Sequence, residues 1–448
     1  MNIGDSRSNS CARTWDLGRR KALWGVLCCL PLLAGAGALS AAELSSGTMT
    51  LGQVLERVRQ DNLELKASRK AWEAAQERPA QASALDDPML TVSDMLVPLE
   101  TRGGPLKGQL AFFQKFPFWG DRALRGRAAS MDAEIARQSY RAKSLEILSR
   151  TVRAYYELYF LERTADILKE QTSVLERFAR VAEKKYAVGR EPQAMVFRAQ
   201  VELAGLATDL VTAQEEIVSA QARLNALLER PPRRPLGAPE SPAVLRTAWD
   251  AEALSRAALA DRPELLALRA LKGRRTAEKK LALRKYFPDL TLGYQYSEVG
   301  GGETMTSFDG RDAVGVSLGL NIPLWLGKNR AAVRQARASL DASKMSVEDL
   351  ANRTRFQVVD LLVKVQTAAR LYKLYDDTVL PQARSALDST QSAYEAGSAG
   401  FLDFLDAERA LLRFALEQER HRVDYAEAVA QLERVVGGPL PQEQGEQP

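Results

Sequence analysis

Hydrophobic residues recur with two different periods along this chain of 448 residues. In six segments, apolar positions return every three or four residues, which is typical of amphipathic helices. These segments are 50–79, 121–186, 192–229, 249–286, 328–394 and 400–436. Neither proline nor glycine occurs between Ala128 and Val188. The second helix would therefore be roughly 100 Å long at about 1.5 Å per residue, which is too long for a compact globule of this size.

Four shorter segments alternate apolar and polar residues and predict β-strands. In 288–297, the residues Leu290, Leu292, Tyr294 and Tyr296 share one face, and 313–323 alternates in the same way. The segments 88–97 and 109–117 are less regular, because Asp94 and Gln114 interrupt the apolar face. Strands of about ten residues suit a membrane barrel, although a half-buried strand of a soluble sheet would alternate likewise.

The sequence contains an internal repeat, because the same order of predicted elements occurs twice. Asp61-Asn62-Leu63-Glu64-Leu65 returns 200 positions later as Asp261-Arg262-Pro263-Glu264-Leu265, and Pro88-Met89-Leu90 returns as Pro288-Asp289-Leu290. We therefore expect two structural repeats, 43–230 and 244–437, each made of a helix, a β-hairpin, a very long helix and a return helix. A proline-rich linker, 231–243, joins them, and 438–448 is expected to be a flexible C-terminal tail.

The N-terminus predicts export from the cytoplasm. Arg19, Arg20 and Lys21 precede an uncharged, leucine-rich stretch that ends in small residues, so 1–42 is predicted to be a signal peptide. An uncleaved membrane anchor is the alternative, and lipidation at Cys28 is disfavoured because Gly25-Val26-Leu27 lacks the usual small residue just before the cysteine. All three cysteines lie in this leader, so the mature chain would contain no disulfide and no thiolate site.

Charge and composition exclude several kinds of function. Removing 1–42 takes five of 62 basic and two of 57 acidic residues, and the remaining charges are interspersed, so no nucleic-acid partner is predicted. His421 is the only histidine and lies among charges in a predicted helix, where a surface role is expected. We therefore expect no enzyme activity, no catalytic residues, no cofactor and no metal site.

Four strands cannot close a membrane barrel, because an open sheet edge in lipid leaves backbone groups unpaired. Several chains must then share one barrel. Two chains would give eight strands and three would give twelve. An eight-stranded barrel is filled by its own side chains, so a pore favours more than two chains without fixing three.

With these features, the sequence resembles the TolC-type outer membrane efflux proteins (outer membrane factors) along essentially the whole mature chain. The strand exits Pro117-Phe118-Trp119-Gly120 and Pro323-Leu324-Trp325-Leu326-Gly327 carry the resemblance, together with Tyr186-Ala187-Val188-Gly189 and Tyr394-Glu395-Ala396-Gly397. The resemblance implies a mainly α homotrimer with a 12-stranded β-barrel in the outer membrane, continued by a long α-helical coiled-coil barrel in the periplasm. It also implies a passive duct that works with a periplasmic adaptor (membrane fusion protein) and an inner-membrane pump, of RND type in this expectation.

The resemblance also implies where a periplasmic gate lies. Asp403 and Asp406 match the family's aspartate constriction, although acidic residues also favour helix N-termini for their own sake. Tyr394 matches a tyrosine that in the family bonds an acidic residue, but Met195 occupies that acidic position and Ala399 replaces a basic link residue. We therefore expect this gate to be held by other contacts.

By the same resemblance, two turns are expected to dock the adaptor. They are Val188, Gly189 and Arg190 in the first repeat and Ala396, Gly397 and Ser398 in the second. The segments 98–108 and 298–312 are expected to form extracellular hairpin loops.

The substrate stays open at this point. The modest chain length and the lack of lipidation make the chain similar to the heavy-metal efflux branch (CusC/CzcC-like). Drugs, organic solvents and type I secretion substrates are the alternative substrates. A soluble periplasmic coiled-coil scaffold is the alternative of another class.

Overall fold

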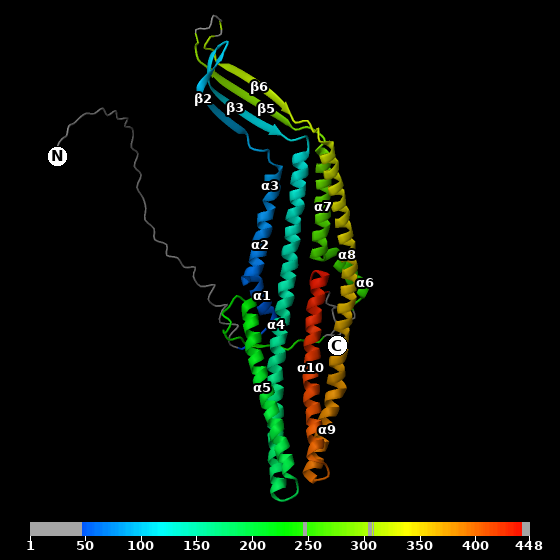
Figure 1. Ribbon diagram of the computed structural model, residues 1–448. Helices are drawn as coiled ribbons and strands as arrows, with labels where there is room; N and C mark the ends of the chain where they lie inside the picture. The colour runs from blue at the N-terminus through cyan, green and yellow to red at the C-terminus, as the bar shows by residue number, and fades with distance from the viewer. Residues whose placement is uncertain (1–46, 245–248, 303–306, 308, 441–448) are drawn as a thin grey trace, which may run out of the picture.

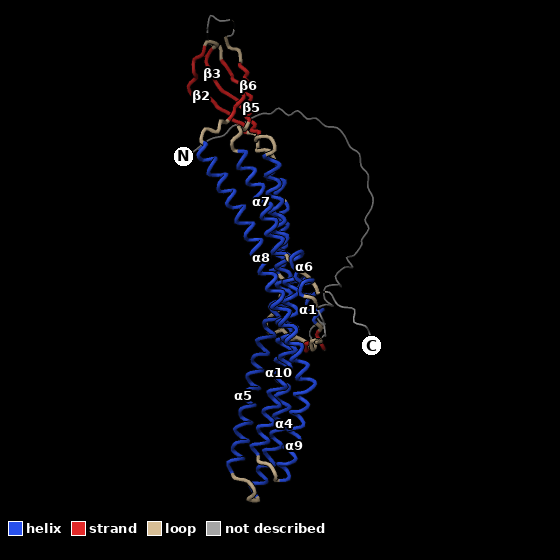
Figure 2. Tube along the Cα trace, turned by 90° about the vertical axis from the view of Figure 1, so that its right-hand side faces the viewer, coloured by secondary structure: helices blue, strands red, loops and turns tan. Residues whose placement is uncertain are grey.

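The computed structural model describes residues 47–244, 249–302, 307 and 309–440. The predicted signal peptide, its cleavage site and nearly all of the C-terminal tail lie outside these residues. The chain forms one long rod, with a β-sheet at one end and two helical hairpins at the other (Figure 1). The second view shows the same division, with the strands at one end of the rod and the turns between long helices at the opposite end (Figure 2).

Four antiparallel strands make the sheet, in the order β2-β3-β5-β6. Their bounds are Met89–Thr101 for β2, Gly104–Phe116 for β3, Leu290–Val299 for β5 and Ala313–Leu320 for β6. Phe112 lies opposite Leu90 on one side and Tyr294 on the other, and Tyr294 in turn lies opposite Val316. Opposed residues share a face, so one face of the sheet is a continuous apolar surface with large exposed side chains.

The first hairpin is longer than expected, and the predicted loop 98–108 is wrong. The ladder continues to the pair Thr101 and Gly104, which leaves only Arg102 and Gly103 in the turn. The loop was expected because the segment is rich in glycine, with Gly103, Gly104 and Gly108. The strand accommodates Pro98 within a shift of register between Asp94 and Leu99.

In the first half, three short helices precede two long ones. They are α1 (Leu51–Asp61), α2 (Leu63–Gln76) and α3 (Arg78–Ser83), followed by α4 (Asp121–Ala187) and α5 (Gln193–Leu227). The single helix expected over 50–79 is thus interrupted, first at Asn62. The Asn62 amide donates to the Leu227 carbonyl at 3.1 Å, and its Oδ1 accepts the Leu65 N–H at 3.0 Å. The break is therefore a helix N-cap fixed by a contact with the end of α5.

The second half repeats this break at the matching position. Here α6 (Ala251–Asp261) and α7 (Pro263–Arg284) replace the single helix expected over 249–286. Arg262 leaves the helical region, with ψ of 118°, because the residue before a proline disfavours the helical conformation. Its buried guanidinium donates to Thr354 Oγ1 at 2.9 Å and Gln357 Oε1 at 2.7 Å.

The helix expected over 328–394 contains an irregular turn. Helix α8 (Leu326–Leu374) passes through a π-helical turn, η1 (Tyr375–Val379), into α9 (Leu380–Ala396), and α10 (Phe401–Val436) returns. Pro381 lies in the first turn of α9, where its ring removes a hydrogen bond and crowds the preceding turn. The wider π-helical turn accommodates the proline without ending the helix. Tyr375 and Asp376 of this turn bind Glu417 and Gln418 of α10 at 2.5 and 2.8 Å.

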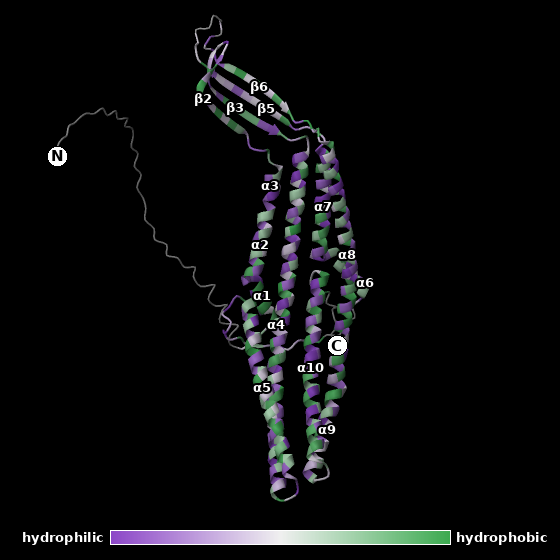
Figure 3. Cartoon of the chain, in the orientation of Figure 1, coloured by the Kyte–Doolittle hydropathy of each residue, from purple (hydrophilic) through white to green (hydrophobic). Residues whose placement is uncertain are grey.

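Near the middle of the rod, β1 (Thr48–Met49) pairs in parallel with β4 (Ala238–Pro239). The buried hydroxyl of Tyr155 on α4 donates to the Met49 carbonyl at 2.5 Å and accepts the Glu240 N–H at 2.7 Å. These bonds tie the start of the first repeat and the linker to the long helix. Hydrophobic and hydrophilic residues are interspersed along the long helices (Figure 3). None of the described helices combines the length and the apolar character needed to cross a membrane.

Candidate functional site

The two turns singled out in the sequence lie at the same end of the rod, away from the sheet (Figure 1). Gly189 and Gly397 both have positive φ, +71° and +82°. At each, the N–H of the next residue reaches back to the carbonyl five positions earlier, from Arg190 to Lys185 and from Ser398 to Ala393, both at 2.8 Å. Both turns are therefore Schellman caps, for which glycine has a backbone reason.

All six predicted docking residues are exposed. They are Val188, Gly189, Arg190, Ala396, Gly397 and Ser398. A Cβ added to either glycine would meet nothing within 4 Å. The tips thus present open surface from both hairpins, within reach of a partner that approaches along the rod axis.

Behind the tips, an aromatic cluster joins the two hairpins. Tyr394 of α9 is fully buried against Phe178 of α4 and against Phe401 and Phe404 of α10. The rings of Phe178 and Phe404 are only 4.0 Å apart between centroids. Lys185 of α4 places its ammonium 3.8 Å from the centre of the Tyr394 ring and donates to the Tyr394 backbone carbonyl. Aromatic packing and a cation–π contact thus hold the hairpin tips of the first and second repeats together.

The Tyr394 hydroxyl has no hydrogen-bond partner among the described residues. Burial raises its pKa to about 12, with the nearby Glu191 carboxylate adding to the effect, so the hydroxyl stays protonated. Met195, at the position that is acidic in the family pattern, packs half-buried against the same apolar cluster. Tyr394 therefore acts here through its ring rather than through a bond from its hydroxyl.

Asp403 and Asp406 lie one turn apart at the start of α10, and both are exposed. The core-facing side of this turn is formed instead by Phe401, Phe404 and Leu405, which are buried. Asp403 Oδ2 accepts the Gly400 N–H at 2.9 Å, so this carboxylate also caps the helix. Both carboxylates point away from the packed face of their own protomer, which leaves them available to a lumen or to a neighbouring chain.

Glu408 was missed by the sequence reasoning. Its side chain is fully buried, and neither carboxylate oxygen has a hydrogen-bond partner among the described residues. Burial, helped by the nearby Glu202 carboxylate on α5 and opposed by Arg409, raises the pKa of Glu408 to about 7. Arg409 itself binds Glu202, with Nε 2.8 Å from Oε1. The signal in the sequence is the spacing, since Glu408 interrupts the apolar stripe of Phe401, Phe404, Leu405 and Leu411.

A second polar network, higher along the rod, was also missed. Arg422 of α10 donates to the hydroxyls of Tyr159 on α4 and Tyr372 on α8, at 3.0 and 2.6 Å. Tyr159 also donates to the largely buried Glu419 at 3.1 Å. These bonds fix three long helices side by side. His421, expected at the surface, is half-buried instead and packs edge-on against Tyr375 of the π-helical turn.

The described residues contain no group of three or more histidine, cysteine, aspartate or glutamate side chains placed to hold a metal ion. The features near the tips are two Schellman caps, the aromatic cluster, the exposed pair Asp403 and Asp406, and the buried carboxyl of Glu408. Such an arrangement can hold two hairpins together and place charge at an opening.

Comparison with known proteins agrees with this geometry. The family model described as "Outer membrane efflux protein" matches residues 54–229 and 254–438. Outer membrane protein TolC of Vibrio cholerae is 24% identical over 318 residues, covering 69% of this chain and 72% of the relative. Cobalt-zinc-cadmium resistance protein CzcC of Cupriavidus metallidurans is 24% identical over 415 residues, covering 88% of this chain and 91% of the relative.

Solved structures share the fold. The outer membrane protein VceC of Vibrio cholerae superposes with a TM-score of 0.73 at 22% identity, covering 87% of this chain and 96% of that one. A crystal structure of CusC gives a TM-score of 0.73 at 16% identity, covering 87% of this chain and 92% of the CusC chain.

Proposed function

This chain belongs to the outer membrane efflux protein family, and from that premise we propose that it is the passive export duct of a tripartite efflux system. It is an outer membrane protein whose helical tube lies in the periplasm. The duct would receive its substrate from a periplasmic adaptor and an inner-membrane pump of RND type. The pump would supply the energy, so the duct itself needs no catalytic residue.

One observation carries this proposal: a single chain places an open four-stranded sheet at one end of a rod and two helical hairpins at the other. Strands β2 and β6 are the edges of the sheet, and each lacks a partner on one side within the described chain. An unpaired edge is costly in lipid, so neighbouring protomers would pair β6 with β2. Three protomers would close twelve strands, which is wide enough to leave a channel.

Docking of the adaptor is proposed for the two exposed tips. Their backbone is fixed by the Schellman caps, so the surface they offer is already shaped before binding. A helical hairpin of an adaptor could pack between the tips without rearranging the caps.

Asp403 and Asp406 would form two acidic rings in the trimer. Stacked rings of carboxylates favour cations and impede anions at a constriction. Their exposure on the unpacked side of α10 supports this placement.

For the substrate, we propose divalent heavy-metal cations. The support is the relative named for cobalt, zinc and cadmium resistance, which aligns along 88% of this chain. Drugs or other organic compounds are the competing class, because another relative is named for pyoverdine export. Family membership disfavours the soluble periplasmic scaffold.

The function is tested in two steps. Envelope fractionation should recover the protein as a heat-modifiable oligomer in the outer membrane, and the purified oligomer should open channels in planar bilayers. A deletion strain should then become more sensitive to zinc, cobalt and cadmium. Unchanged metal tolerance with increased drug sensitivity would contradict the substrate proposal and leave the duct standing.

A further inference from the structure

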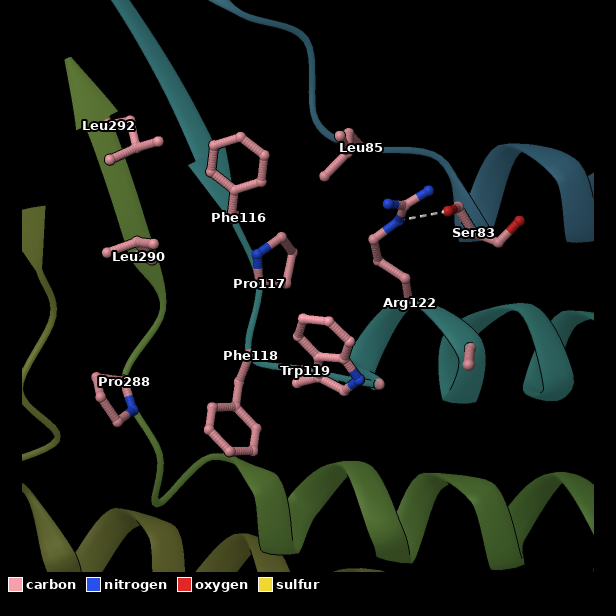
Figure 4. A pocket seen from close by; sticks show the side chains of 12 residues that line it. Ser83, Leu85, Phe116, Pro117, Phe118, Trp119, Arg122, Pro288, Leu290 and Leu292 are labelled. Atoms are coloured by element: carbon pink, nitrogen blue, oxygen red, sulfur yellow. Dashed lines mark hydrogen bonds between the residues drawn. The ribbon is translucent and has the colours of Figure 1, made fainter.

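A cavity of about 830 Å³ lies where the sheet meets the helices, a size typical of small-molecule sites. Figure 4 shows Phe116, Leu290 and Leu292 on its strand side, and Leu85 and Ser83 across from them. Trp119, just before α4, and Arg122, in the first turn of α4, complete the lining of the cavity. The wall is therefore apolar, with one cationic side chain at its helical end.

This cavity continues the apolar face of the sheet. Phe116 lies directly opposite Leu290, and Leu292 lies two residues further along the same face. In an outer membrane protein, an exposed apolar band on the strands faces lipid. The cavity thus opens at the periplasmic end of the lipid-facing surface, where the strands end and the hydrocarbon gives way to headgroups.

Arg122 is held in place at this boundary. Its Nε–H donates to the Ser83 carbonyl at 2.8 Å, and within the described part of the chain the two terminal nitrogens of the guanidinium remain for another acceptor. A guanidinium is well suited to a phosphate, because it presents several donors in one plane. Trp119 beside it is 90% exposed, as is expected of an aromatic residue that meets the interface of a membrane.

We propose that the cavity is a phospholipid site: one acyl chain lies against Phe116, Leu290 and Leu292, and the lipid phosphate binds Arg122. Burial of the acyl chain supplies much of the affinity, and Arg122 selects a lipid that carries phosphate. The site would fix the depth of the barrel in the membrane at the junction with the tube.

A neighbouring protomer is the other possible occupant of this surface. The lipid is favoured because the cavity is continuous with the lipid-facing strands and because its one cation matches an anionic headgroup. The strand residues of the cavity, Phe116, Leu290 and Leu292, belong to the inner strands β3 and β5, so pairing of the edge strands with a neighbour would not by itself fill it.

The test uses the purified full-length oligomer in detergent and native mass spectrometry. The probes are phosphatidylglycerol and a diacylglycerol with the same acyl chains but no phosphate. We expect phosphatidylglycerol to bind about tenfold more tightly, which is the size of one charge-assisted hydrogen bond. Arg122→Gln should lower phosphatidylglycerol binding to the level of diacylglycerol, and Ala123→Trp, which fills the cavity, should weaken both lipids.

Arg127→Gln is the matched control, because Arg127 is an exposed arginine of the same helix outside the cavity. It should bind both lipids as the unaltered protein does. Equal binding of both lipids by the unaltered protein, or unchanged binding in Arg122→Gln and Ala123→Trp, would overturn the proposal. Cross-linking of an Ala123→Cys variant to a second protomer would overturn it as well, because it would place a neighbour in the cavity.

Discussion

The ammonium of Lys185 lies 3.8 Å from the centre of the Tyr394 ring, and this contact joins the end of α4 to the end of α9. Removing it should loosen the packing between the two hairpins at the tip, where we propose that the gate lies. Lys185→Met keeps the length of the side chain but removes the charge, and should cost about 0.5–2 kcal/mol of the contact between the hairpins. Single-channel recordings should then show more frequent opening.

Lys184→Met is the control for this variant, because Lys184 is exposed and one position away on the same helix. Its channels should match those of the unaltered protein. Equal opening in both variants would contradict a specific role for the Lys185 contact.

Tyr394 offers a sharper distinction between ring and hydroxyl. Tyr394→Phe removes a buried hydroxyl that has no partner among the described residues, so it should leave channel opening unchanged and the stability of the protein unchanged or slightly raised. Tyr394→Ala removes the ring from the aromatic cluster and should cost about 3–5 kcal/mol. Conductance and thermal denaturation check both. Opening by Tyr394→Phe as large as that by Tyr394→Ala would show that the hydroxyl makes the important bond.

Glu408 predicts a pH dependence of stability. Its pKa rises from 4.5 to about 7 on burial, so between these values the folded chain binds more protons than the unfolded chain. Stability should therefore be greatest below pH 4.5 and fall as the pH rises to 7, by up to about 3 kcal/mol per protomer. Glu202 on α5 and Arg409 on α10 are the charged groups that influence this carboxyl.

Glu408→Gln should remove this part of the pH dependence and raise the melting temperature at pH 8. The exposed Glu176 on α4 provides the control variant Glu176→Gln, which should keep the dependence. Circular dichroism melts of the purified oligomer from pH 4 to pH 8 measure both. A slope unaltered in Glu408→Gln would mean that other groups cause it.

Asp403 and Asp406 predict ion selectivity. Replacing both with asparagine keeps the acceptor that caps α10 but removes two charges per protomer, so cation preference and block by divalent cations should both fall. Reversal potentials in a salt gradient measure the preference. Asp388→Asn changes an exposed carboxylate of α9 and serves as the control. Selectivity that follows Asp388 rather than the pair would place the constriction elsewhere.

Gly397 in a turn and Gly205 inside a helix predict opposite effects of the same glycine-to-alanine substitution. Gly397→Ala forces a Cβ onto a backbone with φ of +82° and should destabilise the tip by about 1 kcal/mol. Gly205→Ala, in the interior of α5 with nothing within 4 Å, should stabilise by about 0.5–1 kcal/mol. Thermal denaturation of the two variants checks the signs, and a stable Gly397→Ala protein would contradict the Schellman cap.

The family, the fold class and the outer membrane location could be predicted from the sequence, because they depend on local periodicity and on the repeat. Elements that depend on distant neighbours could not. Asn62 breaks a helix by binding the end of α5, and Arg262 does so together with residues of α8. The π-helical turn before Pro381 is likewise fixed by α10.

The candidate site divides in the same way. The sequence indicated the glycine turns and the acidic pair, since glycine at a helix end and aspartate at a helix start are local features. It did not indicate that Lys185 would stack on Tyr394 or that Glu408 would be buried without a partner, because both depend on how α4, α5, α9 and α10 pack together.

Cysteine cross-linking of the sheet edges can show whether several protomers share one barrel by pairing β6 with β2. One variant carries a cysteine in β2, at Val92 for example, and a second cysteine in β6, at Val316. In outer membranes, the β2 cysteine of one protomer should form a disulfide with the β6 cysteine of the next. We expect a ladder of bands that ends at three protomers, and a trimer that conducts ions. A ladder that ends at two, or a monomer recovered in the soluble periplasmic fraction, would contradict it.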